Sequence, residues 1–150
     1  MNSMLRTRAS DLAMGLANET KVIGLLKRHL GKLYQEEDLI NTKDIYDQYH
    51  KYDWEGSTNG THFEMKSRRN RKTAYPTTII PVDKVRPTEK KQVFIFHFTD
   101  KTCYIEYDKA TFDKFHKSER TTERDGRWDK PKLHYDIPVN LLIDLDEDTI

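Results

Sequence analysis

The sequence predicts one α/β domain built around a mixed sheet, and three observations lead to this prediction. A chain of 150 residues is about the size of one ordinary domain. An amphipathic helical segment precedes several strand-like segments, and a second helical segment follows them. The apolar run at the centre of residues 91–98 is continuous, as in a strand buried on both faces. We therefore expect a single domain over residues 1–150, with flexible tails at residues 1–9 and 144–150.

The composition favours a folded domain inside the cell. Charged residues make up 34% and hydrophobic residues 35% of the chain, and 11% are aromatic, which argues against wholesale disorder. No apolar run approaches the roughly 20 residues that span a bilayer, and residues 1–10 lack the apolar core of a secretory signal. Cys103 has no second cysteine to bond with, which is typical of a reducing compartment, and we expect it to be a small core residue. We expect an intracellular location, in the cytoplasm or the nucleus, and no membrane partner.

The first helix is predicted over residues 10–30. Ser10 is a suitable N-cap, and Gly31 is expected to stop the helix. Apolar residues recur along it at steps of three and four, and Glu19 fills the one gap in this stripe. A carboxylate in a core-facing stripe is costly without a partner. Glu19 therefore either meets a cation or metal, or emerges at the rim of the core, where it rotates outward or bonds a backbone amide at the sheet edge.

A β-hairpin is predicted next. Residues 45–54 are rich in aromatic side chains, and residues 55–60 contain an Asn-Gly pair with neighbouring Gly and Ser, a strong signal for a tight turn. The returning strand is predicted over residues 61–67. Because side chains alternate in a strand, His62, Glu64 and Lys66 share one face. Asp53 can then approach Glu64 across the hairpin.

The remaining elements are predicted from shorter patterns. Strands are expected over residues 77–82, 91–98 and 102–107, a helix over 109–117, a charged surface loop over 114–127, and a terminal strand or short helix within 133–145.

The acids and the lysine of this hairpin, together with Glu19, suggest metal-assisted phosphodiester hydrolysis. Carboxylate oxygens are the ligands that Mg²⁺ prefers, and the ion usually keeps waters and meets substrate phosphate on its open side. A bound metal polarises the phosphoryl group and lowers the pKa of the attacking water, and a lysine nearby adds charge or orients that water. His62 shares the face of Glu64, but we leave it out of the site because a histidine near a turn is more often a strand-edge side chain.

The pattern of Asp53, ten intervening residues and then Glu64-Met65-Lys66, after a helix bearing Glu19, resembles the PD-(D/E)XK nuclease superfamily. The resemblance implies a restriction-endonuclease-like fold, a mixed central sheet flanked by helices. It implies that Asp53, Glu64 and Glu19 hold Mg²⁺, or Mn²⁺ in its place, and that Lys66 helps to activate water. Proline often precedes the first acid in this family, whereas Tyr52 stands there in this chain.

A basic cluster follows the lysine directly. Five of the seven residues from 66 to 72 are cationic, and we predict that Arg68, Arg69, Arg71 and Lys72 bind a nucleic-acid backbone near the scissile phosphate. Such contacts position a substrate without reading its sequence. The alternative is a solvated loop. A second basic group lies within residues 84–91 and either extends the nucleic-acid contact or serves as solubilising charge.

Together these patterns predict a Mg²⁺-dependent DNA endonuclease, a hydrolase of the restriction, homing, resolvase or viral and phage repair kind. Its partner would be duplex or branched DNA, with RNA left open. Cutting both strands of a duplex needs two sites, so we expect a homodimer or a higher homo-oligomer. The alternative function is a non-catalytic nucleic-acid-binding domain that retains the nuclease fold.

Overall fold

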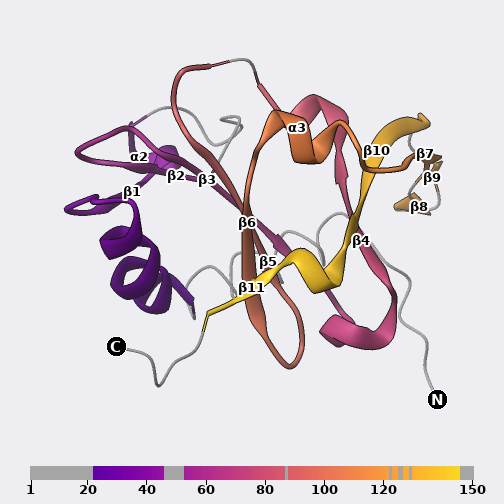
Figure 1. Ribbon diagram of the computed structural model, residues 1–150, viewed down its shortest axis with the longest axis horizontal. Helices are drawn as coiled ribbons and strands as arrows, with labels where there is room; N and C mark the ends of the chain where they lie inside the picture. The colour runs from indigo at the N-terminus through magenta and orange to yellow at the C-terminus, as the bar shows by residue number, and fades with distance from the viewer. Residues whose placement is uncertain are drawn as a thin grey trace.

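The computed structural model describes residues 22–45, 53–86, 88–121, 123–124, 127–128 and 130–145 (Figure 1). The described part is mixed α/β, with few helices and mostly antiparallel strand pairing, and this agrees with the predicted α/β class. Glu19 and residues 46–52 lie outside the described residues.

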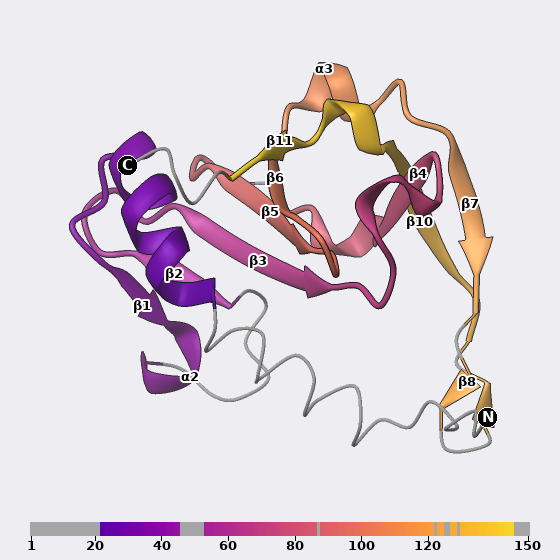
Figure 2. The same ribbon diagram turned by 90° about the horizontal axis from the view of Figure 1, so that it is seen from below.

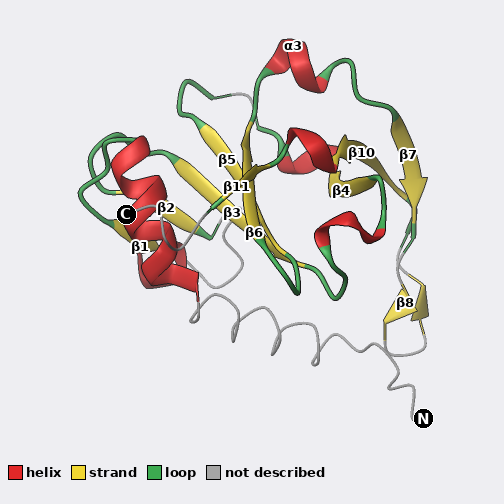
Figure 3. Cartoon of the chain, turned by 60° about the horizontal axis from the view of Figure 1, so that its bottom comes forward, coloured by secondary structure: helices red, strands yellow, loops and turns green. Residues whose placement is uncertain are grey.

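Within the described residues, the strands form a six-stranded sheet, a three-stranded sheet and a two-stranded ribbon (Figure 3). The six-stranded sheet has the order β1 (Leu39–Asn41), β2 (Trp54–Gly56), β3 (His62–Ser67), β5 (Gln92–His97), β6 (Thr102–Glu106) and β11 (Ile143–Asp144). The three-stranded sheet has the order β4 (Thr77–Pro81), β10 (Lys132–Pro138) and β7 (Lys117–Arg120), and the ribbon pairs β8 (Glu123–Arg124) with β9 (Arg127–Trp128).

Helical segments connect and cover these strands. They are a helix over residues 22–33, the short helices α2 (Thr42–Ile45) and α3 (Lys109–Phe112), and the 3₁₀ turns η1 (Lys72–Ala74), η2 (Val82–Lys84) and η3 (Val139–Leu141). β3 and β5 pair in parallel, whereas the other strand pairs among the described residues are antiparallel.

The central strand β5 separates two hydrophobic cores. Val93 and Ile95 pack with the helix over residues 22–33, whereas Phe94 and Phe96 pack with the three-stranded sheet, and all four are at most 2% exposed. This confirms the prediction of a strand buried on both faces. Cys103 is also fully buried, as predicted, and burial raises the pKa of its thiol to about 12.

The two faces of the large sheet are covered differently. The helix over residues 22–33 lies on one side of β3 and β5, and the three-stranded sheet lies on the other (Figure 2). The expectation of a sheet flanked by helices is met in part: the helix over residues 22–33 covers one face, and on the other face Phe112 of the short helix α3 packs together with the three-stranded sheet. Leu133, Tyr135 and Ile137 alternate with polar residues along β10. Tyr135 and Ile137 are buried against the large sheet, so β10 covers part of its second face.

The first helix ends two residues beyond the predicted stop at Gly31. Gln35 adopts a left-handed backbone conformation, with φ of 55°. The Glu36 N–H donates to the Gly31 carbonyl at 2.8 Å, and the Gln35 N–H donates to the Lys32 carbonyl at 3.2 Å. These two bonds form a Schellman motif, in which glycine usually takes the position of Gln35.

Gln35→Gly should stabilise the protein by about 0.5–1 kcal/mol, because glycine adopts a positive φ without the steric cost that a side chain brings. Urea unfolding followed by circular dichroism measures this change. Lys32→Gly is the matched control: it places glycine within the helix and should destabilise by about 1 kcal/mol. A Gln35→Gly protein less stable than the wild type would contradict the C-cap assignment.

The segment after β6 differs most from the prediction. The helix expected over residues 109–117 is only α3, Lys109–Phe112, in which the Asp108 carboxylate caps the Thr111 N–H at 2.9 Å. The charged segment predicted as a loop then forms β7, which pairs with β10. Polar strands of this kind gain their stability from the neighbouring strand, which a local sequence pattern does not reveal.

The C-terminal segment continues the large sheet. β11 pairs Ile143 with Tyr104 and Asp144 with Cys103, so the first residue of the expected C-terminal tail lies within a strand. No helix in the described ranges is both long and apolar enough to cross a membrane.

Candidate functional site

The predicted hairpin is present, but β2 begins at Trp54, where the expected strand over residues 45–54 ends, and Ile45 lies in α2. β2 and β3 pair antiparallel, with Trp54 opposite Phe63 and Glu55 opposite His62. Gly60 takes a positive φ of 71° in the predicted turn. Continuing this register by one residue places Asp53 opposite Glu64, as the sequence predicts.

Asp53 is held at both its backbone and its side chain. Its N–H donates to the Phe63 carbonyl at 3.0 Å, and its carbonyl accepts from the Thr42 N–H at 2.9 Å. Its Oδ2 accepts from the Met65 N–H at 2.7 Å. The carboxylate therefore lies against the strand segment that carries Glu64.

Phe63 and Met65 of β3 belong to the core beneath the first helix, and Glu64 projects from the other face of this strand. It is 7% exposed, yet it is ionisable and lies between two ammonium groups. Glu64 Oε1 is 3.4 Å from Lys66 Nζ and also 3.4 Å from Lys84 Nζ. Two ammonium groups beside a buried carboxylate offset the cost of burying its charge, and a bound metal cation would do the same.

Lys84 belongs to η2, far from the hairpin in sequence. Together with His62, Glu64 and Arg86, it lines a small cleft closed by Gln92, Val93 and Phe94. Gln92 holds the backbone of Arg86 at both ends, accepting from its N–H at 3.0 Å and donating to its carbonyl. The cleft thus places two further cationic residues beside the carboxylate.

Arg86 has a polar atom without a partner. Its Nε is buried, and among the described residues no group accepts a hydrogen bond from it. Buried donors are nearly always satisfied, so such an atom at the wall of a cleft indicates a missing acceptor. A water molecule or an oxygen atom of a phosphate can be that acceptor.

The predicted basic cluster divides into two kinds of residue. Arg69 and Arg71 are exposed, and Arg71 Nε lies 3.6 Å from Asp100 Oδ2. The Arg68 guanidinium contacts its own chain, where it donates to Thr78 Oγ1 and lies 5.5 Å from the centre of the Phe96 ring.

Lys72 points toward the C-terminal strand. Its side chain is only 13% exposed, and its Nζ donates to Asp144 Oδ1 at 2.6 Å. Burial lowers the pKa of this ammonium, but the Asp144 carboxylate outweighs burial and raises it. Lys72 therefore stabilises the attachment of β11, and Arg69 and Arg71 are better placed for an external phosphate.

Glu36 fixes the hairpin turn to the end of the first helix, although no sequence pattern singled it out. Its carboxylate, 7% exposed, accepts four hydrogen bonds: from the N–H groups of Thr58, Asn59 and Thr61, and from Thr61 Oγ1. Burial raises the pKa of Glu36, but these bonds outweigh it and lower the pKa below 4.5. An added Cβ at Gly56 would come within 2.4 Å of this carboxylate, so glycine is required there.

Two of the predicted metal ligands, Asp53 and Glu64, lie in the described residues, and Glu19 lies outside them. Within the described ranges, no three His, Cys, Asp or Glu side chains gather closely enough to hold a metal ion. Two carboxylates are nevertheless a sufficient protein contribution for Mg²⁺, which often takes its other ligands from water and substrate phosphate.

Comparison with protein-family models, curated proteins and solved structures finds no match to this chain. Function must therefore be inferred from the site itself.

The sequence pattern does not single out three residues that are important in the folded structure: Lys84, Arg86 and Glu36. Lys84 and Arg86 were noticed only as members of a basic group, because their approach to Glu64 depends on how η2 packs against β3. Glu36 follows a helix and precedes a Gly-rich turn by about 20 residues, and only the folded chain brings the two together.

Proposed function

We propose that this chain is a metal-dependent nuclease of the PD-(D/E)XK type, with a restriction-endonuclease-like fold, that hydrolyses phosphodiester bonds in DNA. The observation that supports it best is the arrangement on β2 and β3. Asp53 precedes β2 and lies against β3, and Lys66 Nζ is 3.4 Å from the buried Glu64 carboxylate. Aligned acids with an adjacent lysine suit hydrolysis of a phosphodiester better than they suit binding alone.

Each group has a distinct part in this proposal. Asp53 and Glu64, with Glu19 on sequence grounds, would hold Mg²⁺ or Mn²⁺. When bound, the ion would polarise the phosphoryl group and favour deprotonation of the attacking water. Lys66 would orient that water and offset the charge that develops on the phosphoryl oxygens. The low exposure of Glu64 limits competing bulk water and strengthens these interactions.

Lys84 and Arg86 would hold the substrate phosphate. Both line the cleft at Glu64, and the buried Arg86 Nε lacks an acceptor among the described residues. The charges of the side chains at this site favour binding of both a metal ion and a phosphodiester. Two carboxylates and two lysines nearly cancel, so a divalent cation gives the site a net positive charge that matches a phosphodiester.

Lys84→Gln should strengthen Mn²⁺ binding by about two- to fivefold while slowing cleavage, because the variant removes an ammonium that competes with the metal for Glu64. Isothermal titration calorimetry measures the affinity for the metal alone. Lys109→Gln, which removes an exposed cation on α3, should leave that affinity unchanged. Weaker Mn²⁺ binding by Lys84→Gln would contradict the proposed competition.

The proposed activity is tested with labelled DNA in four forms: duplex, four-way junction, flap and single strand. Cleavage of at least one form should appear with Mg²⁺ or Mn²⁺ and disappear with EDTA. Binding without cleavage of any form would favour the non-catalytic nucleic-acid-binding domain.

Cutting both strands of a duplex at once takes two sites, and we propose that a symmetric homodimer or a higher homo-oligomer supplies them. The apolar segment over residues 137–143 offers two exposed side chains to such an interface. Ile137 and Leu142 of this segment are buried in the core, whereas Leu141 and Ile143 are 45% and 54% exposed and remain available to a second copy.

A further inference from the structure

The three-stranded sheet has an outer face that the proposed cleavage site does not use. Tyr135 and Ile137 of β10 are buried against the large sheet. Lys132, His134 and Asp136 alternate with them and therefore project to the outer face.

Two cations lie directly opposite each other on this face. Lys132 on β10 is the register partner of Arg120 on β7, and their side chains are 59% and 47% exposed. Like charges at opposed positions of neighbouring strands destabilise a sheet. Arg120 lies 3.3 Å from Asp136 and Lys132 lies 3.7 Å from Asp83, and an external anion between the two cations would offset the repulsion that remains.

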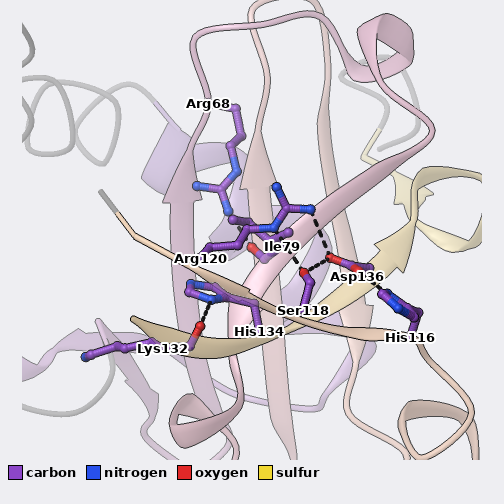
Figure 4. Close-up of polar contacts among 8 residues, drawn as sticks. All are labelled: Arg68, Ile79, His116, Ser118, Arg120, Lys132, His134 and Asp136. Carbon is purple, nitrogen blue, oxygen red and sulfur yellow. Dashed lines mark hydrogen bonds and ion pairs between the residues drawn. The ribbon is translucent and has the colours of Figure 1, made fainter. Parts of the chain in front are cut away.

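Asp136 connects three side chains at this face through hydrogen bonds (Figure 4). Its side chain is 10% exposed, and it accepts from Ser118 Oγ at 2.9 Å, from Arg120 Nη2 at 3.3 Å and from His116 Nδ1 at 2.6 Å. Burial raises the pKa of Asp136, but these hydrogen bonds outweigh burial and lower it, so the carboxylate stays ionised at neutral pH.

As a result, the Asp136 carboxylate on the outer face is largely covered by the side chains that bond to it. β4, β7 and β10 place one acidic side chain on this face, Asp136, because Glu119 of β7 pairs with Leu133 on the opposite face. Asp136 also fixes the orientation of Arg120. A cation that is already held in place loses less conformational entropy when it binds an anion.

The face adjoins the proposed cleavage site at two points. Arg68 follows Lys66 by two residues on the chain, and its guanidinium donates to the carbonyl of Ile79, the register partner of Asp136. At the other end of the face, Lys132 Nζ lies 3.7 Å from Asp83, the neighbour of Lys84 in η2.

We propose that Arg120 and Lys132 form a second contact surface for the phosphate backbone of DNA, next to the cleavage site. The surface rests on the proposed function. Contacts of this kind hold the substrate without selecting its sequence.

The test is a binding measurement in EDTA, where no metal-dependent cleavage occurs. Fluorescence anisotropy of a labelled DNA duplex is recorded over a range of salt concentrations for the wild type and for Arg120→Gln/Lys132→Gln. The double variant should bind about tenfold or more weakly at about 100 mM salt, and its slope of log K against log salt should be smaller by about two.

Lys32→Gln/Lys109→Gln is the matched control, because it removes the same charge from exposed positions on other elements. Removing Arg120 also removes a bond to Asp136, so Lys132→Glu is measured as well and should weaken binding more than Lys109→Glu does. If the variants match their controls in DNA affinity and in salt dependence, the proposed second contact surface is wrong, even if the protein cleaves DNA. Surface-dependent binding by a protein that never cleaves would support the surface and refute the nuclease proposal.

Discussion

Lys66→Ala is expected to slow single-turnover DNA cleavage by about 10²–10⁴-fold, with DNA binding in EDTA changed little. Lys66 Nζ contacts the buried Glu64 carboxylate at 3.4 Å, so in the proposed site it would lie where water is activated and where phosphoryl charge develops. An interaction made mainly in the transition state affects the rate of the chemical step and leaves binding of the ground state nearly unchanged.

Lys109→Ala is the control for this prediction, because Lys109 is exposed and pairs with Asp113, the residue that follows α3. It should cleave at the wild-type rate. A Lys66→Ala protein that also cleaves at that rate would remove Lys66 from the site, and a loss of activity matched by an equal loss of binding would make Lys66 a phosphate contact.

Glu36→Ala should destabilise the protein by about 2–4 kcal/mol. Its carboxylate accepts four hydrogen bonds from the hairpin turn, and the substitution leaves buried donors such as the Thr61 hydroxyl without their partner. Urea unfolding measures the change. Glu37→Ala alters the exposed neighbouring carboxylate and should have an effect within about 0.5 kcal/mol.

The same carboxylate predicts a dependence of stability on pH. The pKa of Glu36 is lower in the folded protein than its ordinary value of 4.5. Its contribution is therefore fully present above about pH 4.5 and is lost as the pH falls through the lowered folded value. The stability difference between the wild type and Glu36→Gln should shrink between about pH 5 and pH 3. A difference that stays constant over this range would mean that Glu36 is not ionised in the turn.

The hairpin could be predicted because its signals are local. The Asn-Gly turn sets the register, and alternation along β3 separates Glu64 and Lys66 from the buried Phe63 and Met65. The same holds for β5, whose continuous apolar run reflects a core on each face. These features depend on residues close together in sequence.

One error is local. Gly31 resembles a helix stop, yet the helix ends at a Schellman motif in which Gln35 is left-handed and Glu36 bonds to the Gly31 carbonyl. The other errors and omissions arise where distant segments decide the structure. β7 is charged and was expected to be a loop, yet it forms a strand because β10 lies beside it. Lys84 reaches Glu64 only through packing of η2, which no local pattern encodes.

The most direct test of the proposed metal-dependent site is the rate of DNA cleavage as a function of Mg²⁺ concentration, measured for the wild type and Glu64→Gln. Gln keeps the size of the side chain and removes its charge. The wild-type rate should rise with Mg²⁺ and saturate, whereas the rate of Glu64→Gln should stay at least about 10²-fold lower at every Mg²⁺ concentration. Equal rates for the two proteins, or wild-type cleavage that persists in EDTA, would contradict the assignment of Asp53, Glu64 and Lys66 as a metal-dependent site.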